Sequence, residues 1–518
     1  MSAEDAPPPA ERGSFGAGLG LGGLSFLVTL TVGLVSSIVI ARIYGVRVVG
    51  EFALASAPMV AAWSLSNLRQ GPALVRILST QPARAPAVTG LFAAVSAVSF
   101  GITAVVVAIL AGGSALVFRG PLDRPDLLGP ALVLLAQFLF FVNPGWNLEN
   151  VFSAFRAGRS LFWIRLVEAL VVLAASVVAS LVEETVWALV LATCFGAGVT
   201  LIQRVVLVRR WMALRTTRAA LREAFARVPE ILRFGLRLAP GNLAEGISYD
   251  VPIWVIGLSL PATAVGAYSR AWQTASRLFA SGYRINEMLL PTLVERIAGG
   301  DRDAFDRTLL DTARYAALAL LLVAAAAGGA AEGVMHIFGP GFEAGSDALA
   351  ILLVTPALTV VVGVEAQAQY ALNRPWASTA TAVIGMVAKV VGVIVLTETS
   401  GLTGAAAGFA AGTLLQFLIQ SADVARHLHG PARRWLPPRQ LIGIVVAYAA
   451  GFAAARVADQ ALAEPFGLVA GLAAGSAVFL AAHLWVGGLL ERDRRRIATA
   501  RRRLARAQAA DHGAPAGG

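Results

Sequence analysis

Residues 161–232 read LFWIRLVEALVVLAASVVASLVEETVWALVLATCFGAGVTLIQRVVLVRRWMALRTTRAALREAFARVPEIL. In this stretch two apolar runs are separated by the pair Glu183-Glu184, and the arginine-rich segment 208–232 follows the second run. An apolar run of about 20 residues is the length that an α-helix needs to cross a bilayer core about 30 Å thick. Short cytoplasmic loops hold the excess of arginine, so the acidic pair is predicted to lie outside and the arginine-rich segment inside.

The same alternation extends over most of the chain, which contains about fourteen apolar stretches of roughly 18–25 residues. Gaps rich in arginine alternate with acidic or uncharged gaps, apart from the first outside gap, which holds Arg47, and the mixed gap 113–126. We therefore predict an all-α integral membrane protein with about fourteen transmembrane helices and both termini in the cytoplasm. The predicted spans are 21–42, 50–70, 87–112, 127–145, 161–182, 185–207, 233–257, 264–287, 312–333, 346–370, 377–397, 401–425, 440–457 and 465–489.

The composition excludes an ordinary soluble domain. The chain is 57% hydrophobic and 14% charged, with a mean hydropathy of +0.71, whereas soluble domains are about 25% charged. Cytoplasmic arginines that face anionic lipid headgroups explain the net charge of +11, so nucleic acid is not expected as a partner. The single cysteine, Cys194, excludes an intrachain disulfide. Residues 1–20 lack the basic start of a signal peptide, and we interpret them as a cytoplasmic segment before an uncleaved first span.

The segment 208–232 is predicted to be an amphipathic surface helix, because apolar side chains lie on one side and arginines on the other. It would link two lobes of six helices, 21–207 and 233–425, on the cytoplasmic side. A helical hairpin at 440–489 and a basic cytoplasmic tail at 490–518 would complete the chain. The side chains that define the two faces of the linker are Leu214, Leu221, Phe225, Arg215, Arg218 and Arg222.

A weak internal repeat supports the division into two lobes. Val49-Gly50-Glu51-Phe52 resembles Val265-Gly266-Ala267-Tyr268 at an offset of 216 residues, and residues 155–159 resemble residues 370–374 at an offset of 215. Similar offsets at matching places indicate duplication. An even number of helices in each half gives both halves the same orientation, as in transporters with parallel repeats, whose substrate site lies between the halves.

Short segments along residues 20–425 are specific as an ordered set, although each is weak alone. They are Ala41-Arg42-Ile43-Tyr44-Gly45, Gly50-Glu51-Phe52-Ala53-Leu54-Ala55, Gly71-Pro72-Ala73-Leu74-Val75-Arg76, Tyr249-Asp250, Gly266-Ala267-Tyr268, Leu290-Pro291, Ile337-Phe338-Gly339-Pro340-Gly341-Phe342 and Asn373-Arg374-Pro375. The set resembles polysaccharide flippases of the multidrug/oligosaccharidyl-lipid/polysaccharide (MOP) exporter superfamily. The resemblance implies a central cavity lined by the first, second, seventh and eighth helices, alternating access, and transport of lipid-linked sugars.

Three arginines in the predicted span 264–287 form the clearest candidate site. Arg270, Arg277 and Arg284 are spaced by seven residues, which returns an α-helix to within about 20° of the same face. Gln273 lies near that side. A planar guanidinium suits phosphate oxygens, so Arg270 and Arg277 are predicted to bind the phosphate of the substrate in turn. The alternative is that they pair with acids of the preceding span and only hold the lobes together.

The preceding span contributes Arg237, Glu245 and Asp250 as further candidates for substrate binding. Charges inside a membrane span are costly, about 2.5–3.5 kcal/mol each on insertion scales, so they face a cavity or a partner. Pro240-Gly241 would loosen the helix and is a candidate bending point. Glu245 or Asp250 could bind a coupling cation; an ion pair with the next span is the alternative.

The first two spans contribute Trp63, Asn67 and Arg42. Trp63 could stack on a sugar ring and Asn67 could hydrogen-bond to it, although an interfacial or lipid-facing position is the commoner role of tryptophan. Arg42, near the outer end of the first span, could contact the phosphate in the outward-facing state.

Away from the predicted cavity, Lys389 is the only lysine of the chain, and Glu365 is its predicted partner. Glu149, Arg165 and Glu168 form a similar intramembrane set in the first half. We interpret both sets as structural or as a secondary cavity.

The predicted function is translocation of a prenyl-(pyro)phosphate-linked oligosaccharide across the bacterial inner membrane for cell-surface polysaccharide biosynthesis. No enzyme activity, cofactor or metal is expected. The partners would be the prenyl-linked sugar, membrane lipids, and glycosyltransferases or a polymerase of the same pathway. One alternative is a cation-coupled drug or metabolite exporter of the same superfamily. A second is a membrane-embedded sugar polymerase or glycosyltransferase, which the short outer gaps disfavour.

Overall fold

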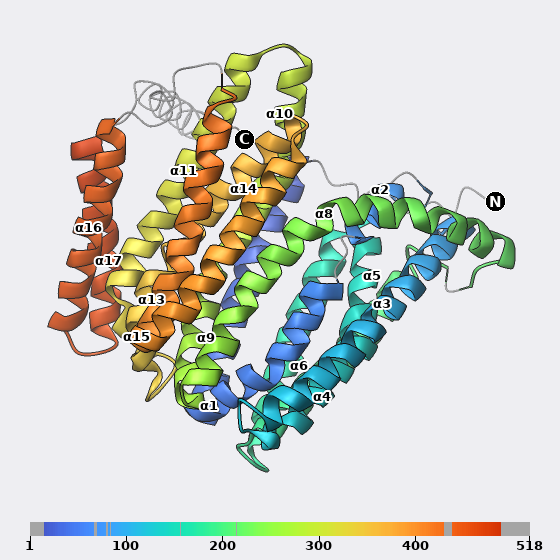
Figure 1. The fold of residues 1–518 in the computed structure, drawn as a ribbon, viewed down its shortest axis with the longest axis horizontal. Coiled ribbons are helices and arrows are strands. Elements are labelled where there is room, and N and C mark those ends of the chain that lie inside the picture. Colours follow the sequence, from blue (N-terminus) through green and yellow to red (C-terminus); the bar gives the residue numbers. More distant parts are fainter. Residues whose placement is uncertain are drawn as a thin grey trace, which may run out of the picture.

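The computed structural model describes residues 15–66, 70–78, 81–82, 84–155, 157–213, 215–428 and 438–487. Within these ranges every regular element is a helix, and the elements are arranged as a bundle (Figure 1). In chain order they are α1 (Phe15–Ser66), α2 (Gln70–Leu78), α3 (Pro86–Arg119), η3 (Pro125–Leu127), α4 (Leu128–Gln137), η4 (Phe138–Val142), α5 (Asn143–Ala154), α6 (Gly158–Ser180), α7 (Val186–Val208), α8 (Arg218–Ser259), α9 (Ala262–Ser276), α10 (Phe279–Ala298), α11 (Arg302–Gly329), α12 (Ala331–His336), η5 (Phe342–Gly345), α13 (Ser346–Leu352), α14 (Thr355–Ala371), α15 (Pro375–Ala425), α16 (Pro438–Ala461), α17 (Phe466–Ala482) and η7 (His483–Gly487).

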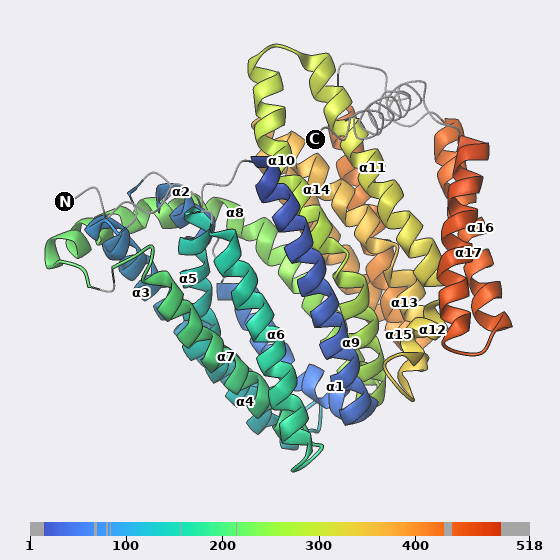
Figure 2. The same ribbon diagram turned by 180° about the vertical axis from the view of Figure 1, so that it is seen from behind.

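The helices form two groups that lie side by side and approach each other at one end. Figures 1 and 2 show α3 to α7 tilted away from α11 to α15, with α1, α8 and α9 between them. We call α1 to α7 the first lobe and α9 to α15 the second lobe. The C-terminal pair, α16 and α17, packs on α11 at the far side of the second lobe, where Gly329 of α11 meets the backbone of Phe452 in α16.

The prediction of an all-α membrane protein is confirmed. Ten helices of the described part of the chain are long and apolar enough to cross a bilayer. Two of these, in α1 and α15, each join two legs across a reversal, which lies at Gly45 (φ 71°) in α1 and at Gly401 (φ 57°) in α15. A positive φ is open to glycine at little cost. The helices α8 and α9 fall outside the ten, so the number fourteen stays a prediction.

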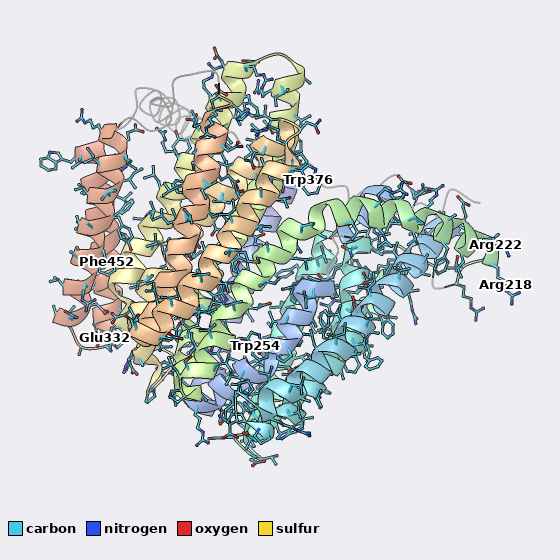
Figure 3. All side chains as sticks on the ribbon, viewed as in Figure 1. Arg218, Arg222, Trp254, Glu332, Trp376 and Phe452 are labelled. Carbon is cyan, nitrogen blue, oxygen red and sulfur yellow. The ribbon has the colours of Figure 1, made fainter. Side chains whose placement is uncertain are left out.

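Charge distinguishes the two ends of the bundle. We call the end that holds Arg209, Arg296 and Arg374 the basic end, and the end that holds Glu183 and Glu332 the acidic end. Figure 3 shows Glu332 at the acidic end of the second lobe and Trp376, next to Arg374, at its opposite end. This separation follows the alternation of charge along the chain.

The two exceptions to the alternation are neutralised at the acidic end by ion pairs. Arg47 contacts Glu51 at 3.1 Å. Arg124, in the mixed gap, contacts Glu51 at 2.9 Å and Asp126 at 2.9 Å. Glu51 therefore pairs with both arginines, and the local excess of positive charge at this end is offset.

The lobes meet at the acidic end through a reciprocal contact between the two copies of the internal repeat. A Cβ atom added to Gly50 of α1 would clash with the carbonyl oxygen of Ala262 and lie 2.8 Å from the nitrogen of Gly266. A Cβ atom added to Gly266 of α9 would clash with the carbonyl oxygen of Val46 and lie 3.1 Å from the nitrogen of Gly50. Adding 216 to Val46 and Gly50 gives Ala262 and Gly266, so the two contacts are equivalent under the internal repeat. The absence of side chains at both positions is what permits the two backbones to touch.

The first part of α8 crosses the basic end of the first lobe before the helix turns into the bundle (Figure 1). The helix begins at Arg218 and continues to Ser259, so the predicted linker 208–232 ends inside it. Thr217 accepts a hydrogen bond from the amide of Ala220 and caps its start. Arg218 and Arg222 lie at the outermost turn (Figure 3). The buried side chains of this part are Ala224, Val228 and Ile231, whereas Phe225 is 45% exposed.

A buried ion-pair network crosses the first lobe. The carboxylate of Glu149 in α5 accepts from Arg204 of α7 at 2.7 Å and from Arg165 of α6 at 2.6 Å. Arg204 also contacts Glu168 of α6 at 3.1 Å. The side chain of Arg204 is 7% exposed and that of Glu149 is 11% exposed. The network therefore ties α5, α6 and α7 together, as the structural interpretation of this set expects.

Replacing Glu149 with alanine is expected to lower the free energy of unfolding by about 3 kcal/mol, because Arg204 would stay buried with only Glu168 as its partner. Unfolding of the detergent-solubilised protein with heat or denaturant measures the change. The control is Glu223→Ala, which breaks the exposed pair with Arg227 and should cost less than about 0.5 kcal/mol. Equal losses of stability in the two variants would contradict the network's role.

Candidate functional site

Arg270 lies buried between the two lobes. It is 7% exposed and sits on α9, which packs along α1. Its Nη1 donates to the hydroxyl of Ser37 in α1 at 2.7 Å and to Oε1 of Gln273 at 2.8 Å. The guanidinium therefore connects the second lobe to the first, and Gln273, also predicted as a site residue, holds it in place.

Arg277 contacts the same face of α1 at Gly33, one helical turn before Ser37. Its Nη2 donates to the backbone carbonyl of Gly33 at 3.0 Å, and its side chain is partly buried. The α-helix is interrupted here, because α9 ends at Ser276 and α10 begins at Phe279. The amide of Leu278 donates to the carbonyl of Ala275, three residues earlier, which tightens the chain into a 3₁₀-type turn. Arg270 and Arg277 both reach α1, whereas the side chain of Arg284, the third arginine of the predicted face, lies outside the described residues.

Both guanidiniums keep donors that no described atom accepts. The Nε of Arg270 and Nη1 of Arg277 are buried without a hydrogen-bond partner among the described residues, as are the hydroxyls of Ser36 and Thr274. No carboxylate of the described part of the chain hydrogen-bonds or forms an ion pair with either arginine. The alternative that they pair with acids of α8 is therefore not what the structure has. The arrangement is a polar, cationic face between the lobes that can accept an anion.

The acidic side chains of α8, Asp250 and Glu245, form other contacts. Asp250 accepts a hydrogen bond from the hydroxyl of Ser64 in α1 at 3.2 Å, and a Cβ atom on Gly246 would lie 2.6 Å from the same oxygen. This contact joins α8 to α1 of the first lobe. Glu245 instead accepts from the hydroxyl of Tyr249 within α8 at 3.2 Å. The side chain of Arg237 lies outside the described residues.

Lys389 does not meet its predicted partner. Its Nζ donates to Oε1 of Gln416 at 2.9 Å and lies 5.3 Å from the ring centroid of Phe409 and 5.8 Å from that of Tyr249. Glu365 accepts from Ser421 at 2.6 Å. The prediction of a Lys389–Glu365 pair is wrong, because an amide and two aromatic faces stabilise the ammonium instead.

The remaining candidates are not gathered at the arginines. Trp63 is 43% exposed and packs edge-on against Trp146 of α5, with ring centroids 4.2 Å apart. Arg42 lies at the acidic end, where its Nε donates to the carbonyl of Ile337 at 2.8 Å and joins α1 to the loop before η5. Asn67 lies outside the described residues. The structure therefore brings together Arg270, Gln273 and Arg277 and leaves Trp63 and Arg42 in separate contacts.

Sequence reasoning missed the partners that α1 supplies to the arginines. Ser37 is one of several serines in an apolar run, and Gly33 acts through its carbonyl, which every residue possesses. Their spacing of four residues, one helical turn, is the only signal that they share a face. The sequence also gave no sign of an aromatic cluster around Trp272. Its ring centroid lies 4.9 Å from that of Phe409 and 5.5 Å from that of Tyr249.

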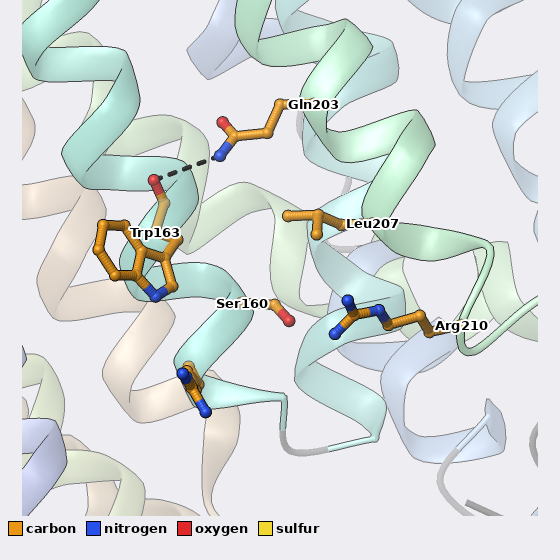
Figure 4. A pocket seen from close by; sticks show the side chains of 6 residues that line it. Ser160, Trp163, Gln203, Leu207 and Arg210 are labelled. Atoms are coloured by element: carbon orange, nitrogen blue, oxygen red, sulfur yellow. Dashed lines mark hydrogen bonds between the residues drawn. The ribbon is translucent and has the colours of Figure 1, made fainter.

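A pocket of about 410 Å³ lies within the first lobe rather than between the lobes. Figure 4 shows it between α6 and the end of α7. Its lining residues are Arg159, Ser160, Trp163, Gln203, Leu207 and Arg210. None of the predicted substrate-binding residues lines it, and a shared cleft between the lobes stays a prediction.

Comparisons with known proteins give a consistent fold. The profile of a family described as "Polysaccharide biosynthesis protein" matches residues 16–295. A structure of the lipid II flippase MurJ in an inward closed conformation superposes with a TM-score of 0.64 at 12% identity, covering 90% of this chain and 98% of that chain.

Two further structures share the fold. An inward-facing multidrug resistance MATE family transporter of the MOP superfamily has a TM-score of 0.54 at 14% identity, covering 77% of this chain and 94% of its own. A MOP superfamily transporter from Pyrococcus furiosus, whose binding pocket is described as having reverse polarity, has a TM-score of 0.51 at 14% identity, with coverages of 79% and 92%. At these identities the likeness is one of fold. A search of curated protein sequences gives no significant match.

Proposed function

The chain belongs to the polysaccharide biosynthesis protein family of the MOP superfamily, and from this premise we propose that it is a flippase for a prenyl-(pyro)phosphate-linked oligosaccharide. It moves the sugar and phosphate across the membrane while the prenyl chain stays in lipid. No covalent bond of the substrate changes. The family and the similar structures are transporters and flippases rather than enzymes.

One observation carries the proposal: Arg270 and Arg277 lie between the lobes with free donors and without a carboxylate partner among the described side chains. Buried cations are costly in a membrane unless a partner offsets them. A phosphate or pyrophosphate is such a partner, because its oxygens accept paired hydrogen bonds from the guanidinium fork. Gln273 orients Arg270. Asp250, Glu245 and Trp63 are proposed to contact the more distant sugar, as are Asn67 and Arg237 in other states of the cycle. Arg42 is proposed to contact the phosphate in the outward-facing state.

The contacts between the lobes support alternating access. At the acidic end the lobes touch through Gly50 and Gly266, and Arg42 bonds to the loop at Ile337. We propose that these contacts break when the substrate leaves and that the basic end faces the cytoplasm, as the positive-inside rule requires. The site would then be loaded at the cytoplasmic face of a bacterial inner membrane, where pathway glycosyltransferases release their lipid-linked product.

Reconstitution into liposomes tests the proposal. With a fluorescent prenyl-pyrophosphate saccharide in one leaflet, the protein is expected to move it to the other leaflet at least tenfold faster than empty liposomes do, a barrier lowered by about 1.4 kcal/mol or more. The matched control is the same saccharide on a prenyl alcohol without phosphate, which should not be moved. Translocation of a cationic drug but not of the phosphate-linked saccharide would favour the exporter alternative, and a change in the substrate's mass would favour an enzyme.

A further inference from the structure

The pocket in the first lobe has no part in the proposed translocation site. It opens beside the basic end of the bundle, between the first turns of α6 and the last turns of α7 (Figure 4). Its volume of about 410 Å³ lies in the range of small-molecule sites, roughly 300–1,000 Å³. Two of its six lining residues are arginines, and one is a tryptophan that is 47% exposed.

The arginines of this region fall into two classes. Arg165 and Arg204, deeper in the lobe, are neutralised by Glu149 and Glu168. Arg159 and Arg210, at the pocket, have no ion pair or side-chain hydrogen bond with any described residue. Glu149 and Glu168 therefore pair with Arg165 and Arg204. The guanidiniums of Arg159 and Arg210 at the pocket remain free to bind an anion.

The start of α6 adds to the positive potential of the pocket. Gly158 is its first residue, so the amides of Gly158, Arg159 and Ser160 have no intrahelical acceptor. The positive end of the α6 dipole therefore lies at the pocket and adds to the positive charge of Arg159 and Arg210. Figure 4 shows Arg210 directed toward Ser160 across the pocket. The amide of Gln203, by contrast, is already bonded to the carbonyl of Trp163 at 3.4 Å.

Beyond the pocket, both helices present apolar side chains to the membrane. Ile202 and Val206 of α7 are 67% and 53% exposed, and Leu170 of α6 is 47% exposed. Trp163 lies between these side chains and the polar pocket, the position that tryptophan takes at a membrane interface. A ligand that fills the pocket with an anionic group therefore has an apolar surface next to it for hydrocarbon chains.

We propose that this pocket binds the phosphate headgroup of an anionic phospholipid from the leaflet at the basic end. Arg159 and Arg210 contact the phosphate oxygens, Ser160 donates a hydrogen bond, and the acyl chains lie along α6 and α7. A basic pocket between transmembrane helices near the cytoplasmic surface is the form that such recognition takes. The pocket selects by charge, so a zwitterionic lipid, whose headgroup carries its own cation, binds less well.

Native mass spectrometry of the full-length protein in detergent, titrated with phosphatidylglycerol or phosphatidylcholine, tests the proposal. The wild type is expected to bind one phosphatidylglycerol in preference to phosphatidylcholine. Because each basic side chain contributes roughly fivefold to binding of an anionic surface, Arg159→Gln with Arg210→Gln should weaken this binding about thirtyfold. The lysine double variant, Arg159→Lys with Arg210→Lys, keeps the charge and should retain most of the affinity.

The matched control is Arg218→Gln with Arg222→Gln, which removes two exposed arginines of the basic end that do not line this pocket. It should leave lipid binding within twofold of the wild type. Equal binding of the two lipids by the wild type, or no effect of the glutamine double variant, would overturn the proposal. Competition by soluble glycerol 3-phosphate at concentrations equal to those of the lipid would also overturn it, because the site would then bind a free phosphate ester.

Discussion

Alanine at Arg277 or Arg270 is expected to reduce translocation of the lipid-linked saccharide at least about thirtyfold. Truncating one member of a buried, hydrogen-bonded charge pair costs about 2–5 kcal/mol, and about 2 kcal/mol corresponds to a factor of about thirty. The yield of folded protein should stay near that of the wild type. Since neither arginine pairs with a described carboxylate, its removal leaves no acid unpaired.

The measurement is flux in the liposome assay, normalised to the amount of protein that elutes as a single species after solubilisation. Arg277→Lys keeps the charge but lacks the planar fork, so an intermediate rate is expected. Arg222→Ala, an exposed arginine on α8, controls for the loss of a positive charge elsewhere. Flux at the wild-type rate in both Arg270→Ala and Arg277→Ala would refute the assignment of the phosphate site.

Alanine at Gly50 is expected to force the lobes apart at the acidic end and to slow transport at least tenfold. The new Cβ atom would clash with the carbonyl oxygen of Ala262, which is backbone and cannot move aside alone. Overpacking of this kind costs about 1–3 kcal/mol, and the protein avoids the cost only in states where the contact is open. Gly266→Ala should act in the same direction, because it clashes with the carbonyl oxygen of Val46.

Spin labels on both lobes at the acidic end report the separation. The labels are attached to Leu181→Cys in the first lobe and Glu398→Cys in the second, two exposed positions. The native Cys194 is replaced by serine. Gly50→Ala should shift the distance distribution to longer values. The control is Gly101→Ala, since a Cβ atom there would meet no other atom within 4 Å. An unchanged distribution together with normal flux in Gly50→Ala would show that the contact does not matter for the cycle.

The existence of the helices was readable from the sequence because hydrocarbon demands long apolar runs whatever the neighbours are. Their joints were readable only in part. The reversal at Gly45 lies in the predicted gap between the spans 21–42 and 50–70, whereas the interruption at Arg277 falls inside the predicted span 264–287. Such an interruption depends on local backbone geometry, which the apolar pattern does not encode.

Partners of buried polar groups were predicted poorly, for a related reason. A charge inside a span must be satisfied, so Arg270 and Lys389 were identified correctly as side chains in need of contacts. The sequence offered carboxylates as the obvious partners, whereas the structure uses a hydroxyl, a backbone carbonyl, an amide and aromatic rings. These acceptors are common in every helix, and only packing selects among them.

The contact of Gly50 with Gly266 is the one that two identical half-length chains would make across a two-fold axis, where a residue of one chain meets its own counterpart in the other. In such a dimer every side chain near the axis would occur twice. Subtracting 216 from Arg270 and Arg277 gives Leu54 and Ala61, which are apolar. The chain thus carries the cationic face on one side of this axis only, an asymmetry that a single polypeptide permits and that two identical halves would not.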